Sequence, residues 1–349
     1  MLSRGAALCR VLVLLGLVAA VTPQKHATAF LDVSARQNPL RRDTDLLPDD
    51  PDDKGDEADG GSLQFLLVTT FAEGAAGTGK VWVVPESDPG DSFMLVSGLD
   101  VPTGVCFDKN NNFLYVADSG LEGSNGRILQ FQIDTNLRSR FILADYTVAT
   151  IYSGPSPYDC WVDAYGNLYF VDSETNSTAI VSYLDLWSGV ADRERVLYQQ
   201  SESNRQVSAP VALQVEDSRT VFFVNNLDPE DAGLLNEASA RSRSLNAGGI
   251  RTDLRVVRRP WGLAVTNSYV YYTTDDGSVW AYRRDDPNLY LKSTQFRQPR
   301  GICKGGNRLY LADSDYGEVF SLSLGSDQDR EPKGVVRIQG AYEVYCLND

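Results

Sequence analysis

Histidine is almost absent from this chain of 349 residues, and the single one is His26. Zinc sites held by histidines, and the Ser–His and Cys–His pairs of many hydrolases, require imidazole side chains. His26 lies in a charged N-terminal stretch with little to bury. We therefore exclude these chemistries for the rest of the chain.

Positive charge is also scarce. Lys and Arg number 32 against 47 Asp and Glu, which gives a net charge of −15. The phosphates of nucleic acids require a basic protein surface. We therefore expect no nucleic-acid partner.

Long apolar runs are missing apart from one near the N-terminus. Residues 11–21 (VLVLLGLVAAV) follow Arg4 and Arg10 and are too few to span a bilayer. Such a run is typical of a secretory signal peptide, here 1–20 with cleavage after Ala20. The alternative, a mitochondrial presequence, would be amphipathic and rich in Ser and Arg. We expect a secreted protein, or one kept in a secretory compartment, with no transmembrane segment in the mature chain.

Two stretches beyond the signal peptide look functional but are interpreted otherwise. Residues 21–62 are charged and poor in apolar side chains, so we expect an acidic disordered leader before a folded domain at 63–349. Residues 74–80 begin like a phosphate-binding loop. Val81 replaces the Ser or Thr that would bind magnesium, and a strand pattern follows where that loop needs a helix.

From residue 63 onward the chain is a series of short β-branched and aromatic runs separated by Gly, Asn and Asp turns. One pattern recurs: a proline, any residue, usually a small residue, alternating apolar positions, a polar turn, and a strand ending near Asp or Asn. Units of about this length with several strands each are typical of propeller blades. The pattern begins at Pro102, Pro157, Pro210, Pro260 and Pro299.

The two ends of this region supply a sixth unit. Residues 341–347 resemble the first strand of a repeat, and 63–71 resemble a second strand without a first. Pairing them would remove the exposed edges of an open sheet. We therefore predict an all-β, six-bladed β-propeller closed by pairing the C-terminal strand with the N-terminal blade. The predicted blades are 63–97 with 341–347, 102–152, 157–199, 210–257, 260–295 and 299–338.

The repeats at 101–131 and 298–320 resemble the NHL-repeat family of six-bladed propellers, and more loosely the YWTD and SMP-30 families. Relatives that are zinc lyases or quinoprotein dehydrogenases need histidines, which the domain lacks. Relatives of the SMP-30 and paraoxonase kind hold calcium with Glu, Asn and Asp at the mouths of the inner strands. The matching positions here offer no carboxylate or amide: Thr103, Tyr158, Val211, Trp261, Arg300 and Tyr342. Asp159 and Glu343, one residue later, are weak candidates for a degenerate metal site, and we expect no cofactor.

Two functions remain open. One is a non-enzymatic propeller that binds a protein or peptide, and the other is a divergent calcium-dependent lactonase or esterase of the SMP-30 kind. The missing calcium ligands favour the first. Trp, Tyr and Arg are enriched in interaction hot spots. We therefore predict a contact at the channel mouth that involves Trp261, Arg300, Tyr342, Tyr158 and Thr103. Its centre is formed by Trp261, Arg300 and Tyr342. The alternative is that these side chains merely plug the mouth.

Cysteine spacing predicts two disulfides. Cys106, Cys160, Cys303 and Cys346 all fall on predicted inner strands. Because side chains alternate along a strand, their positions favour the pairs 106–160 and 303–346 across neighbouring blades. Buried free thiols are the alternative.

Two further features lie in loops. Asn176 begins the sequon Asn-Ser-Thr and is a predicted glycosylation site. The insertion 226–247 carries a helix-start signal, with Asp228 as the N-cap and Pro229 after it. We interpret it as a surface helix that is either decorative or a partner contact.

Overall fold

The computed structural model divides the chain into two compact units, 1–45 and 46–349, and every described residue belongs to the second. The predicted signal peptide, the leader and Asn176 lie outside the described residues. Within the described part, no helix is long and apolar enough to cross a membrane. The structure describes residues 63–122, 124–134, 142–173, 180–184, 194–200, 207–216, 220–226, 234–239, 250–255, 259–285, 289–324 and 331–348.

Six four-stranded antiparallel sheets make up the described chain. From the inner strand outward they are as follows. Blade 1 has β24 (Ala341–Asn348), β1 (Leu63–Thr70), β2 (Gly79–Pro85) and β3 (Phe93–Leu99). Blade 2 has β4 (Pro102–Asp108), β5 (Phe113–Asp118), β6 (Gly126–Asp134) and β7 (Ile142–Gly154). Blade 3 has β8 (Pro157–Val162), β9 (Leu168–Asp172), β10 (Ile180–Leu184) and β11 (Glu194–Gln199). Blade 4 has β12 (Pro210–Glu216), β13 (Thr220–Asn225), β14 (Leu234–Ser239) and β15 (Ile250–Arg255). Blade 5 has β16 (Pro260–Val265), β17 (Tyr269–Thr274), β18 (Val279–Arg283) and β19 (Leu289–Ser293). Blade 6 has β20 (Pro299–Gly305), β21 (Arg308–Asp313), β22 (Glu318–Ser323) and β23 (Lys333–Arg337). A short 3₁₀ turn, η3 (Pro89–Asp91), precedes β3.

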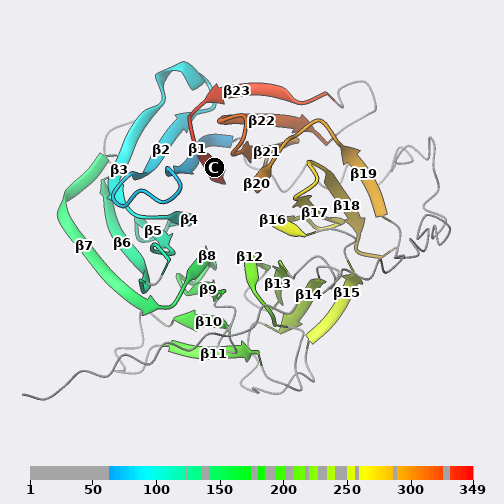
Figure 1. The fold of residues 1–349 in the computed structure, drawn as a ribbon, viewed down its shortest axis with the longest axis horizontal. Coiled ribbons are helices and arrows are strands. Elements are labelled where there is room, and N and C mark those ends of the chain that lie inside the picture. Colours follow the sequence, from blue (N-terminus) through cyan, green and yellow to red (C-terminus); the bar gives the residue numbers. More distant parts are fainter. Residues whose placement is uncertain are drawn as a thin grey trace, which may run out of the picture. The chain divides into compact units, whose positions relative to one another are not determined.

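The six inner strands form a ring around a common axis (Figure 1). Each of β4, β8, β12, β16, β20 and β24 contacts the next, and β24 contacts β4. The sheets are therefore the blades of a β-propeller, as the repeats predict.

The ring closes through blade 1. Strand β24 pairs antiparallel with β1, so that Leu66 lies opposite Cys346 and Val68 opposite Val344. The C-terminal strand thus occupies the position that the first strand of each repeat occupies elsewhere, and it covers an edge of β1 that would otherwise be exposed.

The predicted helix in the insertion is wrong. Residues 234–239 form strand β14, which pairs with β13 on one side and with β15 on the other. Without β14, the edge of β13 would have no partner, and β15 could not join the sheet. The demand for strand pairing therefore overrides the local helix signal.

The Asp or Asn that ends each repeat has a structural role. The carboxylate of Asp118 accepts hydrogen bonds from the backbone N–H groups of Asp100 and Val101, just before the proline of its own blade. The carboxylate of Asp313 likewise accepts a hydrogen bond from the backbone N–H of Arg297, at 2.8 Å. Asp172 and Asn225 likewise accept from Ser156 and Ser208, and all four of these side chains are buried at the end of the second strand of their blades. In blade 5 the second strand ends at Thr274, and the next residue, Asp275, is exposed. This explains why the repeat couples a proline to an acid or amide some fifteen residues later.

The small residue of the repeat allows neighbouring inner strands to approach. A Cβ atom on Gly104 would lie 2.6 Å from the Cα of Asp159, and one on Gly262 would lie 2.2 Å from the carbonyl oxygen of Arg300. Both distances are too short for a real side chain. Glycine at these positions therefore sets the tight spacing of the inner ring.

Candidate functional site

Four of the predicted mouth residues come together from four blades. Trp261, Arg300, Tyr342 and Tyr158 each occupy the second position of an inner strand, on β16, β20, β24 and β8. The Arg300 Cζ atom lies 3.6 Å from the centre of the Trp261 ring and 5.8 Å from that of Tyr342. The hydroxyl groups of Tyr158 and Tyr342 are hydrogen-bonded to each other. The mouth is therefore a packed cluster with a cation stacked between aromatic rings.

Thr103, the fifth predicted residue, is directed elsewhere. It is 2% exposed, and its hydroxyl group is hydrogen-bonded to that of Ser119 at 2.6 Å. Ser119 in turn donates to the carbonyl of Pro157 at the start of the next inner strand. Thr103 thus links blades 2 and 3, and we leave it out of the contact proposed below.

The mouth cluster carries buried donors without acceptors. Nε and Nη1 of Arg300 and Nε1 of Trp261 are inaccessible to solvent and have no hydrogen-bond partner among the described residues. Nη2 of Arg300 donates to the Gln298 side-chain oxygen at 3.0 Å once that amide is oriented to suit its neighbours. Burial raises the pKa of both Tyr158 and Tyr342, so their hydroxyl groups stay neutral. The cluster therefore holds a guanidinium group and an indole whose unpaired N–H donors complement an anion.

Two carboxyl groups lie one residue further along the same inner strands. Asp159 accepts from the N–H of Cys160 at 2.7 Å and from that of Leu213, on the next blade, at 2.9 Å. Glu343 accepts from the N–H of Val344 at 3.0 Å. Burial raises the pKa of Asp159 to about 7. Burial, together with the charge of Asp159, raises the pKa of Glu343 well above its ordinary value.

The described residues offer a metal ion no larger cluster of ligands than such a pair. No group of three or more His, Cys, Asp or Glu side chains converges anywhere in the described ranges. Calcium takes six to eight oxygen ligands, and both carboxyl groups already accept backbone hydrogen bonds. The degenerate cation site considered from the sequence therefore has only two carboxyl groups.

Beyond the carboxyl pair lies a cavity of about 270 Å³. All six inner strands line it, and it reaches the turns that follow β16 and β20. The mouth residues are not part of its lining. One residue from each blade, three positions after the start of its inner strand, contributes to the wall: Val105, Cys160, Leu213, Leu263, Ile302 and Val344. Sequence reasoning missed this row, although the repeat alignment contains it as the next apolar position after the small residue.

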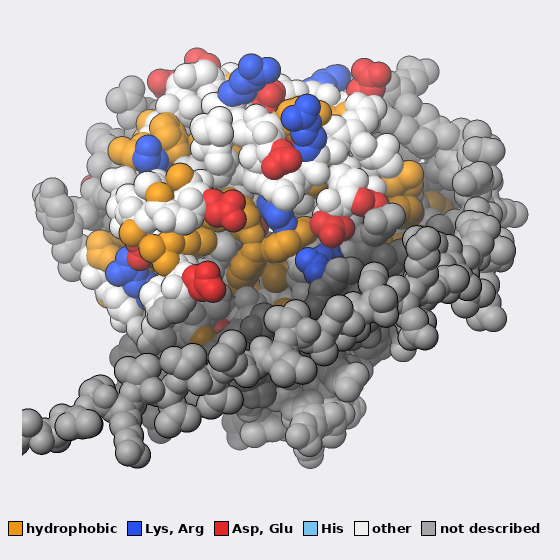
Figure 2. Space-filling model, in the orientation of Figure 1, with side chains coloured by type: hydrophobic (Ala, Val, Ile, Leu, Met, Phe, Trp, Pro, Cys, Tyr) orange, Lys and Arg blue, Asp and Glu red, His pale blue; other side chains and the backbone are white. Residues whose placement is uncertain are grey.

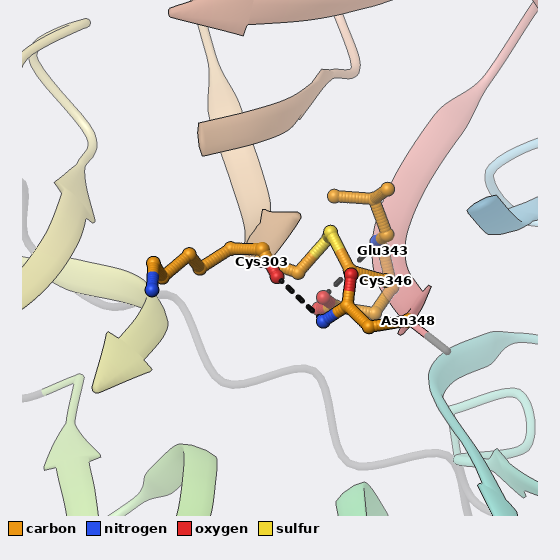
Figure 3. The surroundings of a disulfide bond; sticks show 6 residues. Cys303, Glu343, Cys346 and Asn348 are labelled. Atoms are coloured by element: carbon orange, nitrogen blue, oxygen red, sulfur yellow. Dashed lines mark hydrogen bonds between the residues drawn. A yellow bond between two sulfur atoms is a disulfide. The ribbon is translucent and has the colours of Figure 1, made fainter. Parts of the chain in front are cut away.

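The disulfide prediction is confirmed for one pair. Cys303 on β20 is bonded to Cys346 on β24, with Cα atoms 5.6 Å apart. Figure 3 shows the bond joining the two inner strands, with Asn348 reaching across to the β20 backbone. The bond lies in the wall of the cavity and fastens the closing strand to blade 6.

The other predicted bond is not formed. Cys106 and Cys160 are buried free thiols, although they face each other as predicted, with Sγ atoms 2.6 Å apart. Burial raises the pKa of both thiols.

The outer surface gives a less specific signal. Figure 2 shows one face, on which acidic and basic side chains are interspersed around a group of apolar side chains near the middle. Charges of opposite sign that lie this close offset each other's field. On the described part of this face, the net negative charge is therefore not gathered into one patch.

No protein-family model matches the chain, and no curated protein sequence does either. Solved structures match at low identity. A chain in a crystal structure of a nidogen/laminin complex is 14% identical with a TM-score of 0.61, covering 80% of this chain and 97% of that one. A Bacteroides fragilis "putative 6-phosphogluconolactonase" is 11% identical with a TM-score of 0.54, covering 82% and 98%. The PQQ-bound aldose sugar dehydrogenase of Streptomyces coelicolor is 14% identical with a TM-score of 0.50, covering 73% and 90%. At such identities the likenesses show the fold, a β-propeller.

Proposed function

We propose that this protein is a non-enzymatic, NHL-like propeller of the secretory pathway that binds a protein or peptide at its channel mouth. The observation that carries the proposal is the Arg300 guanidinium, which is stacked on Trp261 and has two buried N–H donors without acceptors. A buried donor that lacks a partner costs about 1–3 kcal/mol. A ligand that supplies acceptors here would recover that free energy.

The chemistry of the mouth indicates an acidic partner. Guanidinium groups bind carboxylates through paired hydrogen bonds, and the indole N–H of Trp261 adds a third donor nearby. Trp, Tyr and Arg are also the side chains most enriched in binding hot spots. The propeller in the nidogen/laminin complex, a fold relative, supports the idea that this scaffold serves protein binding.

The hydrolase alternative rests on the likeness to a "putative 6-phosphogluconolactonase" and on the carboxyl pair. Calcium takes six to eight oxygen ligands, whereas only two carboxyl groups lie here, and both already accept backbone hydrogen bonds. Bound calcium in the purified protein, together with hydrolysis of lactones or aryl esters, would favour the alternative over our proposal.

The test uses a library of short peptides with and without Asp and Glu, screened against the intact protein. We expect selected peptides to carry a carboxylate that cannot be replaced by an amide. Arg300→Ala or Trp261→Ala should weaken binding of a selected peptide by about 2 kcal/mol, roughly 30-fold, at unchanged Tm.

The matched control is Arg297→Ala. Arg297 also stacks on an aromatic ring, that of Tyr316 at 4.6 Å, but Tyr316 is exposed and lies outside the mouth cluster. This variant should bind the peptide like the unaltered protein. Full binding by both mouth variants would refute the proposal. A lower Tm without an effect on binding would show that the cluster only plugs the channel.

A further inference from the structure

The lining of the cavity beyond the mouth cluster changes along the channel, from carboxyl groups to apolar side chains and then to polar ones. Asp159 and Glu343 lie at the end nearest the mouth cluster. Asp159 uses both oxygens to accept backbone hydrogen bonds. Glu343 accepts through Oε1, and no described residue donates to its Oε2 atom. The end nearest the mouth cluster thus presents a carboxylate oxygen with unused hydrogen-bonding capacity.

The apolar wall lies next to the carboxyl groups. It is the row formed by Val105, Leu213, Leu263, Ile302 and Val344, with the Cys160 thiol. Trp161 and Tyr345 follow on the same two strands as the carboxyl groups, with ring centres 5.7 Å apart. Apolar walls favour a hydrocarbon stem, and aromatic rings attract a cation.

Polar groups line the far end of the cavity. Gln214, Asn267, Lys304 and Asn348 contribute there. The buried Oδ1 atom of Asn348 has no partner among the described residues, and its Nδ2 atom donates to the carbonyl of Lys304 at 3.3 Å. This end can therefore hydrogen-bond to a polar group at the outer end of a ligand.

We propose that this cavity binds a primary ammonium group carried on a short apolar stem. The ammonium would lie against Glu343 and Asp159, and the stem would lie within the apolar row. A metal ion fits poorly because only two carboxyl groups converge. An anion fits poorly because the negative charge of these carboxyl groups would repel it. The site is separate from the mouth, so the proposal does not depend on the proposed function.

An entering ammonium group would change the protonation of the two carboxyl groups. Burial raises the pKa of both carboxyl groups. A neighbouring cation favours the ionised form, so an entering ammonium should drive a proton off the pair. The other titratable groups near the pair are the thiols of Cys160 and Cys106, the hydroxyl groups of Tyr345, Tyr158 and Tyr342, Lys304 and Arg300. The pKa of Cys160 and of Tyr345 is raised by burial, so both stay neutral near pH 7.

Two sources could supply this chemistry: a free alkylamine, or a lysine side chain of a peptide. Isothermal titration calorimetry of the full mature chain at pH 7 distinguishes them. One arm compares pentylamine with pentanol, which has the same stem without the charge. The other compares acetyl-Gly-Lys-Gly-amide with its norleucine counterpart. Titration in buffers of different ionisation enthalpy measures the proton released.

We expect pentylamine or the lysine peptide to bind at least tenfold more tightly than its neutral counterpart, with release of protons. Glu343→Gln should weaken that binding at least tenfold. Lys304→Met should strengthen it, because a like charge is removed. Asp285→Asn alters an exposed carboxylate outside the cavity and should leave binding unchanged.

Equal binding of charged and neutral probes would overturn the proposal, and so would failure of both charged probes to bind. Undiminished binding by a folded Glu343→Gln variant would also overturn it. If that variant does not fold, the proton release and the Lys304→Met result decide. Peptide binding at the mouth, measured as above, is unaffected by these outcomes, so the two proposals can fail separately.

Discussion

At the scale of single residues, the channel axis concentrates ionisable groups that burial disfavours. Arg300, Asp159 and Glu343 lie on the inner strands β20, β8 and β24, yet no ion pair joins them among the described contacts. Burial raises the pKa of both carboxyl groups, and the charge of Asp159 raises that of Glu343 further. Burying such groups in their charged form destabilises a fold. Groups with shifted pKa values cluster at functional sites.

The raised pKa values predict how stability depends on pH. The folded protein binds these two protons more tightly than the unfolded chain does, so their contribution is most favourable below the unfolded pKa of about 4 and declines as pH rises toward about 7. Thermal denaturation should show a lower Tm at pH 8 than at pH 5. Asp159→Asn should reduce this difference by about 1 kcal/mol or more, or about 2 °C in Tm. The same slope in the variant would contradict the assignment.

At the scale of elements, an acid or amide at the end of the second strand holds the entrance to the inner strand in place in blades 2, 3, 4 and 6. Asp313 accepts hydrogen bonds from the N–H groups of Arg297, Gln298, Asp315 and Tyr316. Its side chain is fully buried. One carboxylate thus satisfies donors in the loop that enters β20 and in the turn that follows β21, and a missing carboxylate would leave them without acceptors.

Replacing that acid should be costly. Asp313→Ala leaves several backbone donors without partners, and we expect a loss of about 1–3 kcal/mol in the free energy of unfolding. Asp313→Asn retains one acceptor oxygen and should lose less, as Asn225 accepts from Ser208 in blade 4. Urea denaturation of the two variants measures the difference. An alanine variant as stable as the asparagine one would show that the bonds contribute little.

The cysteines give a second prediction at this scale. Alkylation of the denatured, non-reduced protein should label Cys106 and Cys160 and leave Cys303 and Cys346 unlabelled, because only the latter pair is bonded. Peptide mapping identifies the labelled sites. Labelling of all four residues, or of none, would contradict the structure.

At the scale of the whole molecule, β24 holds the ring closed in two ways: it pairs with β1 and is bonded to β20. Deleting 341–349 removes both and exposes the edge of β1. We expect a loss of several kcal/mol, a large part of a domain's marginal stability, and a tendency to aggregate. Calorimetry and light scattering measure these effects.

The paired variant Cys303→Ser with Cys346→Ser separates the two contributions. It removes only the disulfide, so it should lose about 2–4 kcal/mol and remain a closed monomeric ring. A truncated protein that melts like the full chain would refute closure through β24.

The blade repeat and the closing strand can be predicted from the sequence, because apolar alternation and turn residues are local properties that recur from blade to blade. The positions of the cysteines along their strands predicted two disulfides, of which the structure forms the 303–346 bond. Other features depend on how the blades pack together. Residues 234–239 form a strand because β13 needs a partner, whatever the helix signal around them. The stacking of Arg300 on Trp261, the free thiols of Cys106 and Cys160, and the cavity depend on side chains from different blades. Their distances are set by how closely the inner strands pack around the axis, which no single repeat encodes.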